Sequence, residues 1–192
     1  MAKRESSLKN MISTLLVITL VASAALAGVY NLTKEPIAAA TKKKTENAIK
    51  QVIPPFDRLE RFAVMPSDGP DSLILYKGYK GDSIVGTAVQ TYTYKGFSGY
   101  ISIMVGFNAD GSINDIAVLE HKETPGLGTK MTEPKFKDQF KNLNIAQLTN
   151  QKVKVTKDQG TIEAITAATI SSRAFCDAVQ RAWENQKKGG EK

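Results

Sequence analysis

Hydrophobic residues follow three different patterns along this chain. The first is an unbroken apolar run, because no charged residue occurs in the 24 positions from Asn10 to Thr33. At about 1.5 Å per helical residue the run is about 36 Å long, enough to cross a hydrocarbon layer of about 30 Å. It also lacks the polar face of a helix in a soluble protein. The run therefore predicts a transmembrane helix.

The short tail at 1–9 carries an excess of positive charge. Its charged residues are Lys3, Arg4, Glu5 and Lys9. The positive-inside tendency then predicts a cytoplasmic tail at 1–9, a transmembrane anchor at 10–33 and an exported remainder. A cleaved signal peptide is the alternative, because Ala22–Ala24 and Ala25–Ala27 both resemble a small-residue cleavage site. The apolar run continues past both sites, which favours an uncleaved anchor.

A helical stalk is predicted next, at 34–55, with Pro36 in its first turn and Pro54-Pro55 at its end. The second pattern then begins, in segments rich in β-branched and aromatic residues. Turn sequences of Gly, Asn and Asp separate these segments, which predicts an antiparallel meander. The predicted strands are Ser72–Lys77, Ser83–Tyr94, Tyr100–Phe107 and Ile113–Glu120.

The third pattern is a helical period between Ile170 and Gln186, where apolar residues recur three to four positions apart. Before it we expect a short helix and two short strands, at Lys135–Leu143, Val153–Val155 and Thr161–Ile165. The predicted fold class is therefore α+β. A single N-terminal transmembrane helix precedes one domain at 56–187, with an antiparallel sheet and flanking helices, and a polar tail at 188–192.

Composition excludes several functions. A net charge of +7 without an aromatic-interleaved basic patch does not indicate nucleic-acid binding. One cysteine and one histidine exclude an internal disulfide and make a metal centre unexpected. No group of residues suggests a catalytic triad, so we expect no catalytic residue and no metal site.

Two segments have features beyond packing. The first is the loop His121–Gly128, in which one Pro and two Gly allow the backbone to approach a ligand closely. A structural turn is the simpler interpretation. The second is Glu163–Ser172, where small and hydroxyl residues lead into the last helix. Capping by Thr166 or Thr169 explains it without function, but a helix N-terminus also binds phosphate.

Together these two segments resemble a known family. The sequence HKETPGLG, followed some forty residues later by TAATISS behind a single anchor, resembles the FMN-binding domain of the G subunit of the Rnf electron-transport complex. The C subunit of the sodium-pumping NADH:quinone reductase shares that domain. The resemblance covers essentially the whole chain.

The resemblance implies a cofactor and its site. In the family pattern the last Thr of the second motif holds FMN covalently through its phosphate, and here that residue is Thr169. Ala167 stands where Gly is common and Glu163 where Asp is common; a methyl at 167 fits unless φ must be positive. The other implied FMN-binding residues are Glu123, Thr124, Gly126, Leu127, Gly128, Thr166, Ala167, Ala168 and Ser171.

The resemblance also implies a function. The chain would be a membrane-anchored flavoprotein subunit that relays electrons in an ion-translocating ferredoxin:NAD oxidoreductase and is not catalytic alone. Its partners would be the other membrane subunits of the Rnf complex, a flavin transferase and the lipid bilayer, with the FMN domain on the outer face of a bacterial cytoplasmic membrane. Alternatives are the quinone-reductase C subunit, a stand-alone respiratory FMN protein, a soluble enzyme with a cleaved leader and a flavin-free anchored adaptor.

Overall fold

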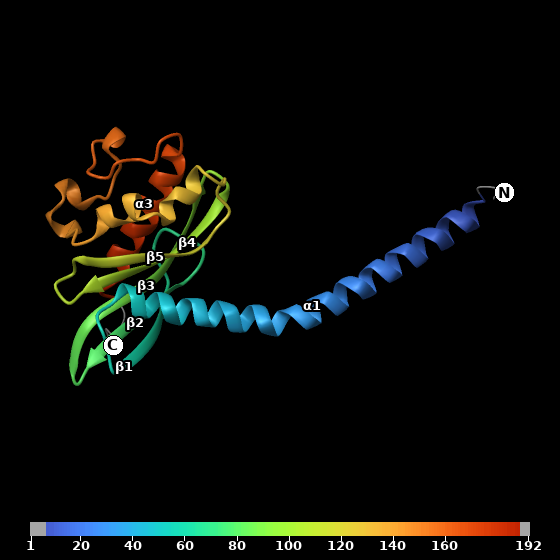
Figure 1. Ribbon diagram of the computed structural model, residues 1–192, viewed down its shortest axis with the longest axis horizontal. Coiled ribbons are helices and arrows are strands. Elements are labelled where there is room, and N and C mark those ends of the chain that lie inside the picture. Colours follow the sequence, from blue (N-terminus) through green and yellow to red (C-terminus); the bar gives the residue numbers. More distant parts are fainter. Residues whose placement is uncertain (1–6, 189–192) are drawn as a thin grey trace. The chain divides into compact units, whose positions relative to one another are not determined.

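A computed structural model describes residues 7–188 and divides the chain into two compact units, Met1–Lys44 and Thr45–Lys192. Residues 1–6 and 189–192, which hold most of the two predicted polar tails, lie outside the described residues. One helix, α1 (Leu8–Val52), covers the predicted anchor and all but the last three residues of the predicted stalk (Figure 1). Pro36 lies inside α1 and does not begin a second helix. The helix is long and apolar enough to cross a membrane, with a mean hydropathy of 2.3 in its most apolar window.

The second unit is built on one antiparallel sheet of five strands in the order β1-β2-β3-β4-β5 (Figure 1). The predicted meander is confirmed, with strand ends that differ from the prediction by at most three residues. The strands are β1 (Arg58–Val64), β2 (Leu73–Lys80), β3 (Ser83–Gly96), β4 (Gly99–Asn108) and β5 (Ile113–His121). The sequence did not predict β1, whose residues are all exposed or half-buried.

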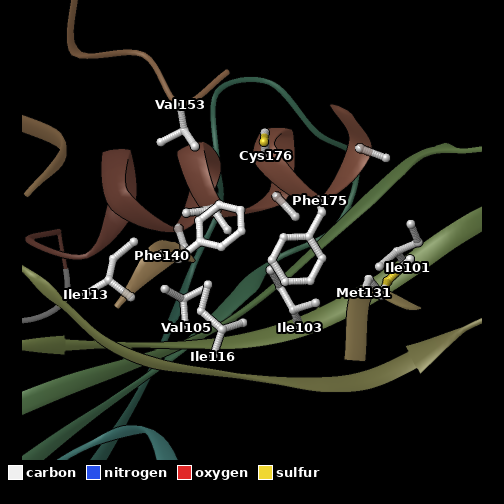
Figure 2. Packing of buried hydrophobic residues seen from close by; sticks show 14 of the residues in the cluster. Ile101, Ile103, Val105, Ile113, Ile116, Met131, Phe140, Val153, Phe175 and Cys176 are labelled. Carbon is white, nitrogen blue, oxygen red and sulfur yellow. The ribbon is translucent and has the colours of Figure 1, made fainter. Parts of the chain in front are cut away.

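One face of the sheet is covered by α3 (Thr169–Asn185) and by the segment between β5 and α3. Alternate residues of β4, including Ile103 and Val105, point into this core, as strand geometry requires (Figure 2). Phe140 and Phe175 pack above them with ring centroids 5.2 Å apart. This core fixes the start of α3 against the sheet.

The other face of the sheet is covered by the last turn of α1. Ala48, Ile49 and Val52 are buried there together with Met104, which points away from the α3 face. Gly106 permits this contact, because a Cβ at that position would overlap the Val52 carbonyl oxygen. The sheet therefore lies between two helices, and the end of α1 is part of the folded domain.

The segment between β5 and α3 contains less regular structure than the sequence predicts. The expected helix at 135–143 is one turn, α2 (Pro134–Lys137), followed by a 3-10 turn, η2 (Asp138–Phe140). The two expected strands are wrong, since only an isolated parallel bridge joins Val155 to Ile162. The remaining 3-10 turns are η1 (Gly128–Thr132), η3 (Ile145–Gln147), η4 (Thr149–Gln151) and η5 (Thr156–Asp158).

Candidate cofactor site

A cavity of about 290 Å³ lies where the two sequence motifs meet. The loop after β5 forms one side, the N-terminus of α3 forms another, and the tip of the β3–β4 hairpin adds a third. Small-molecule sites usually measure about 300–1,000 Å³, so the cavity is large enough to enclose part of a cofactor. Its lining residues are Phe97, Glu123, Thr124, Leu127, Gly128, Ala167, Ala168, Thr169, Ile170 and Ser171.

The loop side is held in shape by bonds within the loop. The Leu127 backbone N–H donates to the Thr124 carbonyl oxygen at 3.2 Å, and the Gly126 N–H donates to Thr129 Oγ1 at 2.9 Å. Gly126 has φ +75°, a left-handed conformation that suits glycine. As a result the Leu127 side chain is 40% exposed at the edge of the cavity.

Glu123 connects all three sides of the cavity, although it is only 4% exposed. Its Oε1 accepts a hydrogen bond from the Ser98 N–H at 3.0 Å, which ties the hairpin tip to the loop. Its Oε2 accepts one from Ser171 Oγ at 2.5 Å, which ties the loop to α3. Both carboxylate oxygens are therefore engaged by the protein itself, and Glu123 sets the shape of the cavity.

The helix side begins without a side-chain cap. Ala168 is the N-cap of α3, with φ −133°, and it makes no capping hydrogen bond. The alternative that Thr166 or Thr169 caps the helix is therefore wrong. Ser172 is the hydroxyl that organises this turn, since its Oγ accepts from the Ile165 N–H at 2.9 Å. The N-terminus of α3, with its partial positive charge, borders the cavity through Thr169, Ile170 and Ser171.

Ala167, the residue before the N-cap, has φ +61°. This is the left-handed region, which an alanine adopts at a cost of about 1–2 kcal/mol. The position therefore does require positive φ, and this explains in physical terms why a glycine would suit it. The strain is confined to the backbone, because Ala167 is exposed.

Thr169 is half-buried, and a lysine holds its hydroxyl from outside the cavity. Lys157 Nζ, in η5, donates to Thr169 Oγ1 at 3.2 Å. Next to it Asp158 accepts from Nε and Nη2 of Arg173 at 2.7 Å each, and this hydrogen bonding lowers the pKa of Asp158. The charges of Asp158 and Arg173 offset each other, whereas the positive charge of Lys157 stands beside Thr169 at the α3 N-terminus and makes the site electrostatically suited to an anion.

The structure brings eight of the ten predicted site residues to the cavity and leaves two aside. Thr166 lines a neighbouring cavity of about 250 Å³, together with Glu163. Gly126 shapes the loop without lining the cavity. Phe97 and Ile170, which line the cavity, and Lys157, which contacts Thr169, were missed by the sequence analysis. An exposed aromatic in the Gly-Phe-Ser-Gly turn was a weak signal for Phe97, whereas no local signal marks Lys157.

Comparison with known proteins places this geometry in a family. The family described as FMN-binding domain matches residues 96–184, a range that contains every lining residue of the cavity. The chain is 33% identical over 177 residues to the G subunit of the ion-translocating oxidoreductase complex of Methanosarcina acetivorans, covering 90% of this chain and 91% of that protein. This chain belongs to the same family of G subunits.

Two further proteins extend the comparison. The G subunit of the proton-translocating ferredoxin:NAD(+) oxidoreductase complex of Clostridium ljungdahlii is 29% identical to this chain over 185 residues, covering 95% of this chain and 93% of that protein. Among solved structures, NqrC of Shewanella oneidensis aligns with 64% of this chain and 62% of its own, at 23% identity and a TM-score of 0.47.

Proposed function

We propose that this protein is the subunit of an ion-translocating ferredoxin:NAD oxidoreductase that carries FMN covalently on Thr169 and relays electrons between its partners. The observation that carries the proposal is the cavity itself. It joins the Glu123–Gly128 loop to the start of α3, inside the range that matches the FMN-binding domain family. The G subunit to which this chain is related belongs to an ion-translocating oxidoreductase complex, and an electron carrier of this kind would work in such a complex.

The residues fit the cofactor at both of its ends. A phosphate on Thr169 Oγ1 would lie at the uncapped N-terminus of α3, where a negative charge gains about 0.3–1 kcal/mol and up to about 2 kcal/mol when partly buried. Apolar side chains at the rim, Phe97, Leu127 and Ile170, are between 40% and 68% exposed and offer surface to an aromatic ring system. The small side chain of Ala168, which lines the cavity, lets the ligand approach the backbone at the start of α3.

FMN, when bound, supplies one- and two-electron transfer, and the protein supplies binding and orientation. Thr169 would form an ester between its Oγ1 and the phosphorus atom of FMN. The hydroxyl loses its proton, and a phosphoanhydride bond of an activated flavin dinucleotide breaks, so that the second nucleotide leaves. No electron is transferred in this step. It requires a flavin transferase as a maturation partner.

We further propose that residues 10–33 of α1 span the membrane, that the following part of α1 forms a stalk whose last turn packs on the sheet, and that the FMN-binding domain lies on the outer face. The hydroxyls of the apolar segment support this, because they bond within the helix. Thr19 Oγ1 donates to the Leu15 carbonyl at 2.9 Å and Thr33 Oγ1 to the Val29 carbonyl at 2.8 Å. Polar groups in lipid need such internal partners. The anchor would hold the domain beside the other membrane subunits, and the chain would not be catalytic alone.

The test is direct. The full chain is produced with a flavin transferase, denatured, separated on a gel and viewed under ultraviolet light. We expect a fluorescent band, and digestion after basic residues should release the peptide 158–173 with the mass of FMN less one water. Fragmentation should place the group on Thr169. Thr169→Ala should abolish the band, whereas Thr161→Ala, in the same peptide, should retain it. An unmodified peptide would refute the proposal and favour a flavin-free adaptor.

A further inference from the structure

Lys157 contacts the hydroxyl of Thr169 but belongs to neither motif. Its Nζ lies 3.2 Å from Thr169 Oγ1, although twelve residues separate the two in the chain. Within residues 7–188, no ion pair neutralises this lysine. A positive charge thus stands at the atom that would carry the phosphate.

The backbone around Lys157 is held in place by several independent contacts. The Thr156 N–H donates to the Ile162 carbonyl at 2.8 Å and the Gly160 N–H donates to the Val155 carbonyl at 3.0 Å, which closes the turn. Gly160 packs so tightly that a Cβ there would overlap the Lys154 carbonyl oxygen. The position of Lys157 is therefore set by the fold of this turn.

A bidentate ion pair fastens the same turn to α3. Asp158 and Arg173 are joined by two bonds of 2.7 Å, one turn along the helix from Thr169. Because Arg173 occupies the carboxylate of Asp158, this acid does not compete for the neighbouring lysine. The pair thus sets the distance between Lys157 and Thr169 while leaving the lysine charge available.

We propose that Lys157 is a positioning residue that binds the phosphate at Thr169 and orients the threonine hydroxyl for attachment. The inference rests on the proposed function of Thr169. By donating to Oγ1, the ammonium group leaves the hydroxyl proton directed away from Nζ, toward an incoming base. An ammonium has three donors, so it binds the charged oxygens of a phosphate as a point charge.

The experiment measures the initial rate at which the full chain, in detergent, gains fluorescence from a flavin dinucleotide and a flavin transferase. Lys157→Gln should slow attachment about fivefold, the upper range for an exposed charge pair. Lys157→Arg should restore at least half of the rate. Lys154→Gln removes a charge from the same exposed segment, three residues earlier, and should stay within twofold of the wild type.

Salt dependence separates a charge effect from a change of structure. The wild-type rate should fall as salt is raised, and the rate of Lys157→Gln should fall less, because salt screens exposed charges.

Equal rates for wild type and Lys157→Gln, with the wild type labelled on Thr169, would overturn the role of Lys157 and leave the proposed function standing. A slower Lys157→Gln with a lowered unfolding temperature, or without arginine rescue, would make Lys157 merely structural. A wild type never labelled on Thr169 would refute both proposals.

Discussion

The carboxylate of Glu123 accepts a 2.5 Å hydrogen bond from Ser171 Oγ, across 48 positions of the chain. Both side chains are buried, at 4% and 2% exposure. A buried bond to a carboxylate is stronger than one between neutral groups. This contact therefore links the loop after β5 to the first turn of α3 and defines the cavity between them.

Removing this carboxylate should destabilise the protein. In Glu123→Ala the buried Ser171 hydroxyl loses its acceptor, and we expect the free energy of unfolding to fall by about 1–3 kcal/mol. The free energy of unfolding is measured by unfolding the flavin-free chain in urea and monitoring the fluorescence of Trp183 on α3. Glu120→Ala, at an exposed position of β5, is the matched control and should change little. Equal effects of the two substitutions would contradict the role of Glu123.

Substitution of Gly128 by a residue with a side chain should destabilise the protein for a steric reason. A Cβ there would lie 2.6 Å from Glu123 Oε2 and 2.8 Å from Ser171 Oγ. Gly128→Ala should therefore displace the Glu123–Ser171 bond and destabilise by about 1–3 kcal/mol. Gly126→Ala offers a comparison, because its Cβ would meet open space and only its φ of +75° opposes it. Flavin attachment, measured by gel fluorescence, should fall in Gly128→Ala and persist in Gly126→Ala.

Ala167→Gly should stabilise the protein, which is unusual for a glycine substitution. It removes the strain of φ +61° but adds freedom to the unfolded chain, and the net gain should be about 0.5–1 kcal/mol. The same substitution at Ala174, buried within α3, should instead cost about 1 kcal/mol. The midpoints of urea unfolding of the two variants, each compared with that of the wild type, measure these two changes in stability. A loss of stability in Ala167→Gly would show that the left-handed conformation is not the one populated.

Much of the fold was predictable because its signals are local. Alternation along β4 and the helical period of α3 depend on residues that are neighbours in sequence. β1 was missed since Arg58, Glu60 and Arg61 interrupt its apolar residues, as is typical of an edge strand. The two short strands before α3 failed because tertiary packing of Val153, Val155 and Ile162, and not sheet pairing, buries those residues.

The candidate site could also be predicted only where its signals are local. Its two motifs were recognised because each is contiguous in sequence, and the resemblance joined them. Lys157 was not recognised, because its contact with Thr169 depends on how the turn at 156–160 folds back on α3. The cap of α3 was misassigned for a related reason: the Ser172 hydroxyl bonds the Ile165 N–H, so that Ala168 takes the N-cap position.

Acid should weaken the attachment of η5 to α3. The bonds from Arg173 lower the pKa of Asp158 below its ordinary value of 3.8. The ion pair therefore contributes stability above that value and loses it as the pH falls through the lowered pKa. We expect the unfolding temperature of the wild type to exceed that of Asp158→Asn at about pH 6, with the difference shrinking toward about pH 2. In an Arg173→Gln background the pH dependence of the Asp158→Asn effect should be much smaller, because only the charge of Lys154 still lowers the pKa of Asp158, and an unchanged dependence would assign the shift to another group.

Cys176 should be unreactive in the folded protein. It is 3% exposed on the core side of α3, and burial, together with the negative charge of Asp158, raises its pKa to about 12. The thiolate is the reactive form, so the folded chain at about pH 8 should not react with a disulfide reagent such as dithionitrobenzoate. Adding urea should expose the thiol with the same midpoint as the loss of structure reported by Trp183. Ser83→Cys, at an exposed position at the start of β3, should react at once and serves as the control. Fast reaction of native Cys176 would mean that α3 opens from the sheet without global unfolding, and the cavity at its N-terminus would then open with it.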